Sequence, residues 1–208
     1  TVTFTPSAPL AAGAQYTASV SDARDAHGNQ MAEPVIWSFA TVSAQVVTLL
    51  GNQTPATAAA NDTSAVELGM KFRATEDGSV LGVRFYKGAG STGTHGGNLW
   101  TETGTLLATV TFTGESAARW QYATFASPVP VTAAPTYDDS YHAPAGPYPV
   151  NGGYFAAADV TQGPLVGQRS VAGNPNGVYR YGSGGVFPTG SYNDANYWVD
   201  VAFTPAET

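Results

Sequence analysis

The chain has 208 residues, a net charge of −7 at neutral pH and no cysteine. Only eight residues are Lys or Arg. No basic stripe is present to neutralise phosphates, so the composition argues against a nucleic-acid-binding protein. The absence of cysteine excludes disulfides, thiol catalysis and cysteine zinc sites. No apolar run approaches the ~20 residues that a helix needs to cross a bilayer, so we expect no membrane span.

Charged residues make up 11% of the chain, whereas Gly, Thr, Ala, Ser, Val and Tyr are plentiful. Such a composition is typical of an extracellular all-β protein whose surface is covered by hydroxyl and amide groups, and we expect an extracellular or cell-surface location. The chain starts with Thr1 and shows no signal peptide. We therefore expect either a processed form or a piece of something longer.

The first forty residues contain three segments in which apolar and polar residues alternate, as in half-buried strands. They read TVTFTP, QYTASVSDARD and VIWSFATV, and the link PSAPLAAGAQY joins the first two. The region resembles the C-terminal half of a bacterial Ig-like module, and we assign it residues 1–43. A complete module needs about seven strands. We expect strands of a neighbouring chain to complete the half-module by self-association. The alternative is that the half-module packs against the larger domain of its own chain.

Residues 44–208 read as one strand after another, rich in β-branched and aromatic residues, with no helix longer than a turn or two. The pattern indicates a second domain that is an antiparallel β-sandwich. The expected strands are Val46–Leu50, Glu67–Arg73, Val80–Lys87, Thr105–Thr113, Arg119–Phe125, Val129–Val131, Thr136–Tyr141, Gly153–Ala156, Val178–Tyr181 and Tyr197–Phe203.

Five blocks in this domain occur in a fixed order: RFYKG, GTHGGNLW, SYHAP, GVYRYG and YWVDVAF. Together they resemble an uncharacterised bacterial family, a domain of unknown function found in secreted multidomain proteins beside Ig-like modules and carbohydrate-active enzymes. The similarity runs from about Val47 to Pro205. The family has no settled function, and the domains that accompany it in those proteins imply a jelly-roll-like accessory module.

The best candidate for a site is the glycine-rich segment from Arg84 to Trp100, because binding residues tend to lie on loops at one end of a β-scaffold. We expect it to share an end of the sandwich with the SYHAP segment. The two segments would then form one ligand-binding patch from Tyr86, Lys87, His95, Trp100, Tyr141 and His142.

Each of these side chains also has a structural interpretation. The two imidazoles would hold a metal or line a polar pocket, or each would merely hydrogen-bond to backbone. A platform for stacking sugar rings is available in Tyr86, Trp100, Trp120, Tyr141, Tyr179 and Tyr181. For any single ring a core position is the better prediction. The loop-end rings Tyr86, Trp100, Tyr141 and Tyr148 are expected to be the exceptions.

Asp138 and Asp139 stand where the resembled family usually has apolar or small residues. With loop carbonyl groups they would offer the oxygen ligands that calcium prefers. The alternative is a charged strand edge that discourages aggregation, since neighbouring strand residues point to opposite faces.

An enzyme is not expected. Ser140, His142 and Asp139 supply the residue types of a catalytic triad, but residues so close on one strand cannot adopt its geometry unaided. The segment GAGSTGTHGG does not match a phosphate-binding loop. We therefore expect a secreted non-catalytic module that binds carbohydrate or other cell-surface or matrix material. The alternative is a structural segment of an extracellular fibre, completed by β-strands of a neighbouring chain.

Overall fold

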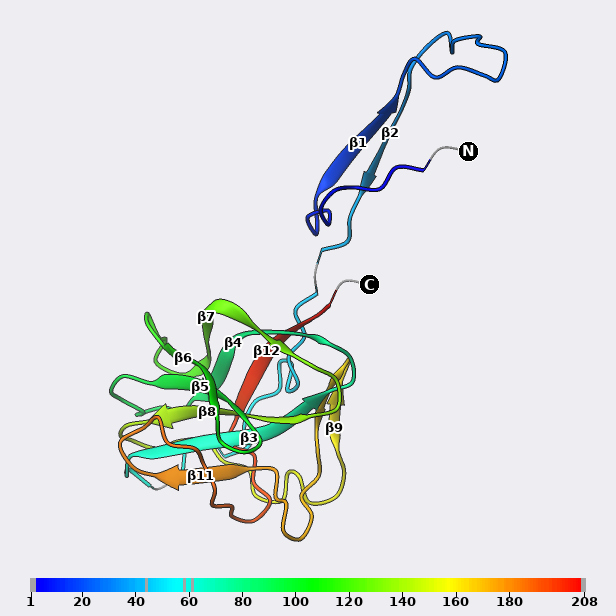
Figure 1. Ribbon diagram of the computed structural model, residues 1–208. Coiled ribbons are helices and arrows are strands. Elements are labelled where there is room, and N and C mark those ends of the chain that lie inside the picture. The colour runs from blue at the N-terminus through cyan, green and yellow to red at the C-terminus, as the bar shows by residue number, and fades with distance from the viewer. Residues whose placement is uncertain (1–2, 44, 58, 61, 207–208) are drawn as a thin grey trace. The chain divides into compact units, whose positions relative to one another are not determined.

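The computed structural model describes residues 3–43, 45–57, 59–60 and 62–206 (Figure 1). The chain divides into two compact units, Thr1–Gln45 and Val46–Thr208. The boundary expected between residues 43 and 44 touches residue 44, which lies outside the described residues.

The first unit is a single antiparallel hairpin of β1 (Gln15–Val20) and β2 (Val35–Ala40), drawn in blue in Figure 1. Residues directly opposite each other share a face. The register therefore places on one face only apolar side chains, namely Tyr16, Ala18, Val20, Val35, Trp37 and Phe39. The rings of Tyr16 and Phe39 stack at 5.8 Å. The strand expected over residues 1–6 is absent from its described part, residues 3–6.

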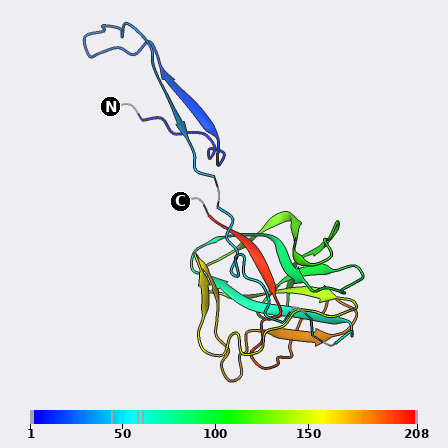
Figure 2. The same cartoon turned by 180° about the vertical axis from the view of Figure 1, so that it is seen from behind.

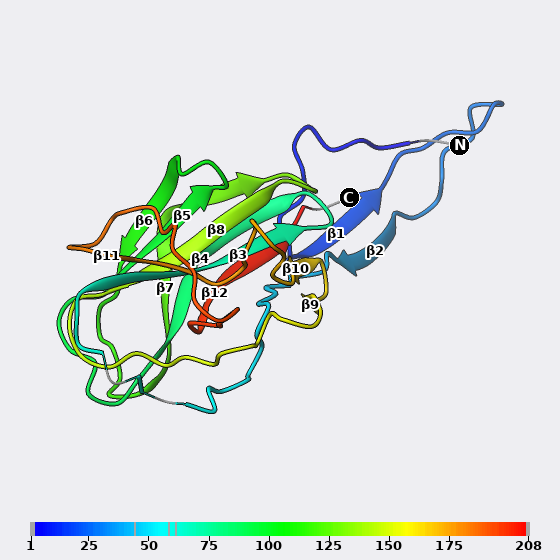
Figure 3. The same cartoon turned by 90° about the horizontal axis from the view of Figure 1, so that it is seen from below.

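The second unit contains two antiparallel sheets (Figures 1 and 3). The larger sheet has the order β6-β5-β8-β3-β10-β9, and β11 also pairs with β3. Figures 1 and 2 show β6 and β9 at its opposite edges. Its strands are β3 (Val66–Ala74), β5 (Gly96–Thr101), β6 (Leu106–Thr111), β8 (Thr136–Ala143), β9 (Val160–Gln162), β10 (Leu165–Gly167) and β11 (Val178–Tyr181).

The smaller sheet has the order β12-β4-β7. It packs against one face of the larger sheet through a shared hydrophobic core. It consists of β4 (Gly78–Lys87), β7 (Arg119–Val131) and β12 (Val199–Pro205). Strand β3 contributes its alternate residues Leu68, Met70 and Phe72 to the core between the sheets. From the other layer the core receives Val83 and Phe85. The period-2 pattern of the sequence therefore identifies the buried face of both strands.

A buried ion pair fixes the segment that precedes the first strand of this unit. Asp200 on β12 lies 2.6 Å from the guanidinium of Arg84 and accepts the backbone N–H groups of Leu49 and Leu50. Because these N–H groups bond to a carboxylate, Val46–Leu50 does not form the expected strand, and only Val47 makes an isolated bridge. The strand expected over Gly153–Ala156 is also wrong, since that segment forms turns.

The expectation of an all-β, sandwich-like fold is confirmed. All pairings between the named strands are antiparallel. The described part of the chain contains no helix. Accordingly, no helix among those residues is long and apolar enough to cross a membrane.

Candidate functional site

The two motif segments meet at one end of the larger sheet. Backbone N–H of Thr92 donates to the carbonyl oxygen of Ala145 at 3.1 Å, and the two residues form a bridge. The approach depends on glycine: a Cβ atom on Gly146 would lie 2.5 Å from the carbonyl oxygen of Gly90. At this end β3 begins at Val66, whereas β8 and β11 end beside it. We refer to it as the loop end.

A polar network holds the first of these loops. His95 places Nε2 at 2.9 Å from the hydroxyl of Ser91 and Nδ1 at 3.0 Å from Glu115 Oε1. Lys87 pairs with the same carboxylate at 2.7 Å. Burial is the main cause that lowers the pKa of His95, so the neutral imidazole is favoured.

This order of groups, hydroxyl to imidazole to carboxylate, is that of a hydrolase relay. Ser91, however, is only 6% exposed and His95 is fully buried. A buried hydroxyl cannot reach a substrate carbonyl, so we interpret the network as a device that positions the loop. The network could not be predicted from the sequence, because Glu115 comes from a different turn and no spacing links it to Ser91.

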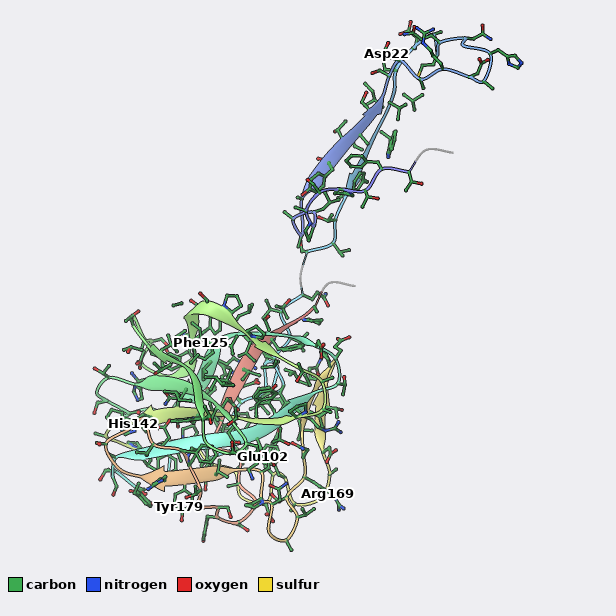
Figure 4. The ribbon with its side chains drawn as sticks, viewed as in Figure 1. Asp22, Glu102, Phe125, His142, Arg169 and Tyr179 are labelled. Carbon is green, nitrogen blue, oxygen red and sulfur yellow. The ribbon has the colours of Figure 1, made fainter. Side chains whose placement is uncertain are left out.

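His142 lies on the other face of the sheet from His95. It pairs in register with Gly96, so the residue next to Gly96 must point to the opposite face. His95 accordingly packs against the ring of Phe85 in the core at 4.8 Å, whereas His142 lies under Gly184. The expected common pocket of the two imidazoles is therefore wrong. Figure 4 shows His142 on its strand β8.

A buried acid lies beside His142 on the outer face of the larger sheet, the face that points away from the core. Glu67 is fully buried, its Oε2 lies 3.6 Å from His142 Nδ1, and burial raises its pKa. Its carboxylate accepts hydrogen bonds from the Nδ2 of Asn98, the Oγ of Ser140 and the backbone N of Gly185. The glycine-rich strap of residues 182–188 covers this cluster. The Glu67 carboxylate lies between the Ser140 hydroxyl and the His142 imidazole. In a catalytic triad the imidazole is the central group, so these residues do not form one.

The remaining expected site residues are dispersed. Tyr141 is 1% exposed because its ring stacks on Phe85 in the core at 4.4 Å. Trp100 is 4% exposed because Phe187 of the strap packs against it. Tyr86 belongs to the smaller sheet and makes an edge contact with Trp120. The prediction that all six side chains form one patch is therefore wrong, since they occupy both faces of one sheet and part of another.

Asp138 and Asp139 do not share a site either. In register Asp138 lies opposite Trp100, whereas Asp139 lies opposite Leu99 on the core face. Both carboxyl groups are buried without a hydrogen-bond partner, and burial raises both pKa values, that of Asp138 to about 7. The pair cannot ligate one calcium ion from opposite faces. Among the described residues no group of three or more His, Asp or Glu is arranged to hold a metal.

An aromatic cluster with one exposed ring does exist at the loop end: Tyr181 is exposed, Tyr148 and Tyr179 are half-buried, and Tyr197 is buried at 3% exposure. We call it the tyrosine patch and define it as Asp62, Tyr148, Tyr179, Tyr181 and Tyr197. Tyr181 is 53% exposed, and its hydroxyl donates to Asp62 Oδ2 at 2.6 Å. Tyr148 donates to the same oxygen at 3.3 Å. Neighbouring rings in the patch make edge contacts at 5.6 to 6.2 Å.

Strand β11 explains how the patch is built. Tyr179 and Tyr181 lie opposite Leu68 and Val66, so both rings stand on the core face of the larger sheet. Tyr181 stands at the last position of the strand, where its ring remains exposed. Figure 4 shows Tyr179 on β11. The sequence offers Tyr148, Tyr179 and Tyr181 as candidate rings, but nothing in it predicts that they meet, because Asp62 lies 119 positions from Tyr181.

Two family descriptions match the chain. The family described as Domain of unknown function (DUF4082) matches residues 52–199, and the family described as Bacterial Ig-like domain matches residues 1–41. The first match spans more than half of the 208 residues. A search of curated proteins gives no match.

Proposed function

Since the chain belongs to the family described as Domain of unknown function (DUF4082), whose description assigns no activity, we propose a function from the geometry: an extracellular, non-catalytic module that binds polysaccharide through the tyrosine patch. An accessory role agrees with the Ig-like match in the same chain. The observation that carries the proposal is Tyr181, whose exposed ring is held in place by Asp62.

Exposed tyrosine rings suit sugars because the apolar C–H face of a sugar ring packs on an aromatic face while its hydroxyl groups stay hydrated. A free side chain loses rotational freedom when it binds, at a cost of about 0.5–1.5 kcal/mol. The hydrogen bond to Asp62 restricts Tyr181 before any ligand arrives. Tyr179 supports the same ring from the side at 5.6 Å.

Affinity electrophoresis against a panel of soluble polysaccharides tests the proposal. The informative variant is Tyr181→Ala, and the matched control is Tyr122→Ala, because Tyr122 on β7 exposes a similar fraction of its side chain, 50%. We expect at least one polysaccharide to retard the native protein and the Tyr122→Ala variant, but not the Tyr181→Ala variant. Equal retardation of both variants, or no retardation by any polysaccharide, would contradict the proposal.

A second candidate function, a structural subunit that self-associates, rests on the hairpin of the first unit. Its apolar face carries Trp37 and Phe39, which are both exposed. Two copies of one such face are self-complementary about a two-fold axis. A second copy of the chain would therefore cover this face with its own hairpin and remove the apolar side chains of both from water.

A further inference from the structure

The tyrosine patch is a closed cycle of groups. Ring centroids of Tyr181 and Tyr179 lie 5.6 Å apart, those of Tyr179 and Tyr197 lie 6.2 Å apart, and those of Tyr197 and Tyr148 lie 6.2 Å apart. Asp62 joins the two ends, because one of its oxygens accepts the hydroxyl groups of both Tyr181 and Tyr148. Two tyrosine hydroxyl groups thus bond to one carboxylate, and Tyr179 and Tyr197 close the cycle through ring contacts alone.

The carboxylate is ionised at neutral pH. Hydrogen bonds to it, above all from the Tyr181 hydroxyl, lower the pKa of Asp62. Its other oxygen accepts the backbone N–H of Ser64. Among the described residues, none of the salt bridges involves Asp62. The side chain of Arg180, the neighbouring cation in sequence, lies opposite Glu67 and so on the other face of the sheet from Tyr181.

Aromatic faces and an ionised carboxylate attract the same kind of ligand group. The face of a tyrosine ring is the negative part of its quadrupole and attracts ammonium groups. A carboxylate adds a full negative charge at the same place. The net charge of −7 further raises the local concentration of cations around the protein.

We propose that the tyrosine patch selects sugars that carry a free, protonated amino group over sugars whose amino group is acetylated or absent. The inference rests on the proposed function and names its substrate class. An amino sugar would stack its C–H face on Tyr181 and direct its ammonium group toward Asp62. Acetylation removes the positive charge and leaves the stacking surface in place.

The test uses the full chain and a β-1,4-linked glucosamine polymer at three degrees of N-acetylation: nearly none, about half and complete. The dissociation constant of each polymer is measured for the native protein and each variant by affinity electrophoresis, at two salt concentrations. We expect binding to weaken about 3- to 30-fold from the least to the most acetylated polymer, the range that a cation at aromatic faces spans. High salt should reduce this ratio.

Two variants separate a local effect from general attraction between an acidic protein and a cationic polymer. Asp62→Asn removes the charge within the patch. Glu76→Gln removes one charge in the turn after β3, at the opposite end of that strand from Val66. The preference for the free amine should vanish in Asp62→Asn and persist in Glu76→Gln. The Asp62→Glu variant, which keeps the charge, should retain part of the preference for the free amine.

Each other outcome overturns the inference. Equal binding of all three polymers, still dependent on Tyr181, rejects amine selection and leaves the polysaccharide-binding proposal standing. A preference that is equally reduced by Asp62→Asn and Glu76→Gln shows a general charge effect. Failure to bind any of these polymers rejects amino sugars as the ligand class, whereas the polysaccharide proposal is judged separately on the wider panel with Tyr181→Ala.

Discussion

The hydroxyl of Tyr181 lies 2.6 Å from the carboxylate of Asp62, although the two residues are 119 positions apart in the chain. The contact holds an exposed ring from β11 against a loop that precedes β3. A ring held in this way presents one face to a ligand at a reduced entropic cost.

Removing only this hydrogen bond should weaken binding without abolishing it. Tyr181→Phe keeps the aromatic face and loses the bond to Asp62, so the ring regains rotational freedom. We expect the dissociation constant for a bound polysaccharide to rise about 2- to 10-fold, which corresponds to ordering one side chain. Affinity electrophoresis should place this variant between the native protein and Tyr181→Ala. Binding as weak as that of Tyr181→Ala would show that the hydroxyl itself contacts the ligand.

The strap over the outer face of the larger sheet depends on Gly184. This residue has φ +94°, and a Cβ atom on it would lie 2.7 Å from the ring of His142. We expect Gly184→Ala to destabilise the protein by about 1–3 kcal/mol through overpacking, in addition to about 1–2 kcal/mol for the backbone conformation.

The matched control is Gly173→Ala, because Gly173 has φ +81° but no atom within 4 Å of its Cβ position. Urea unfolding of both variants measures the difference. If the two substitutions cost the same, the strap does not pack on His142 as described.

The sequence predicted the strands better than it predicted the site, and β3 and β8 show why. Alternation along Glu67–Arg73 identifies the inward side chains, because a strand has a fixed period of two. No periodicity reveals that the strap of residues 182–188 returns to cover Trp100, or that Phe85 stacks on Tyr141. Trp100 and Tyr141 were therefore expected to be exposed, whereas both rings are buried. The tyrosine patch likewise depends on a contact between distant segments.

The buried carboxyl group of Asp138 should make stability depend on pH. Its pKa is raised by burial to about 7, above the value of an unfolded chain near 3.9, so the folded state binds the proton more tightly. Stability contributed by this proton is fully present below pH 4 and is lost as the pH rises through 7. The loss amounts to at most about 4 kcal/mol, since each pKa unit corresponds to ~1.4 kcal/mol.

Asp138→Asn removes this titration. Its unfolding midpoint in urea should therefore fall less between pH 4 and pH 8 than that of the native protein, although Asp139, whose pKa is also raised, keeps part of the dependence. Identical pH profiles for the two proteins would mean that Asp138 is ionised in the folded state.

Self-association through the hairpin predicts a concentration-dependent mass. Sedimentation velocity on the full chain should show a rising fraction of dimer with increasing concentration. Trp37→Asp places a charge on the apolar face and should give a monomer. Val42→Asp is the control, because Val42 is also exposed but lies outside β2. A monomer for the native chain at every concentration would exclude the structural candidate.

The central claim, that polysaccharide binds at the tyrosine patch, is tested most directly by NMR of the protein with labelled tyrosine rings. An oligosaccharide of a polysaccharide that retards the native protein is titrated in. We predict shifts in the ring signals of Tyr148, Tyr179 and Tyr181, with the signal of Tyr122 unchanged. Shifts confined to Tyr122 or to other tyrosines outside the patch would contradict the claim.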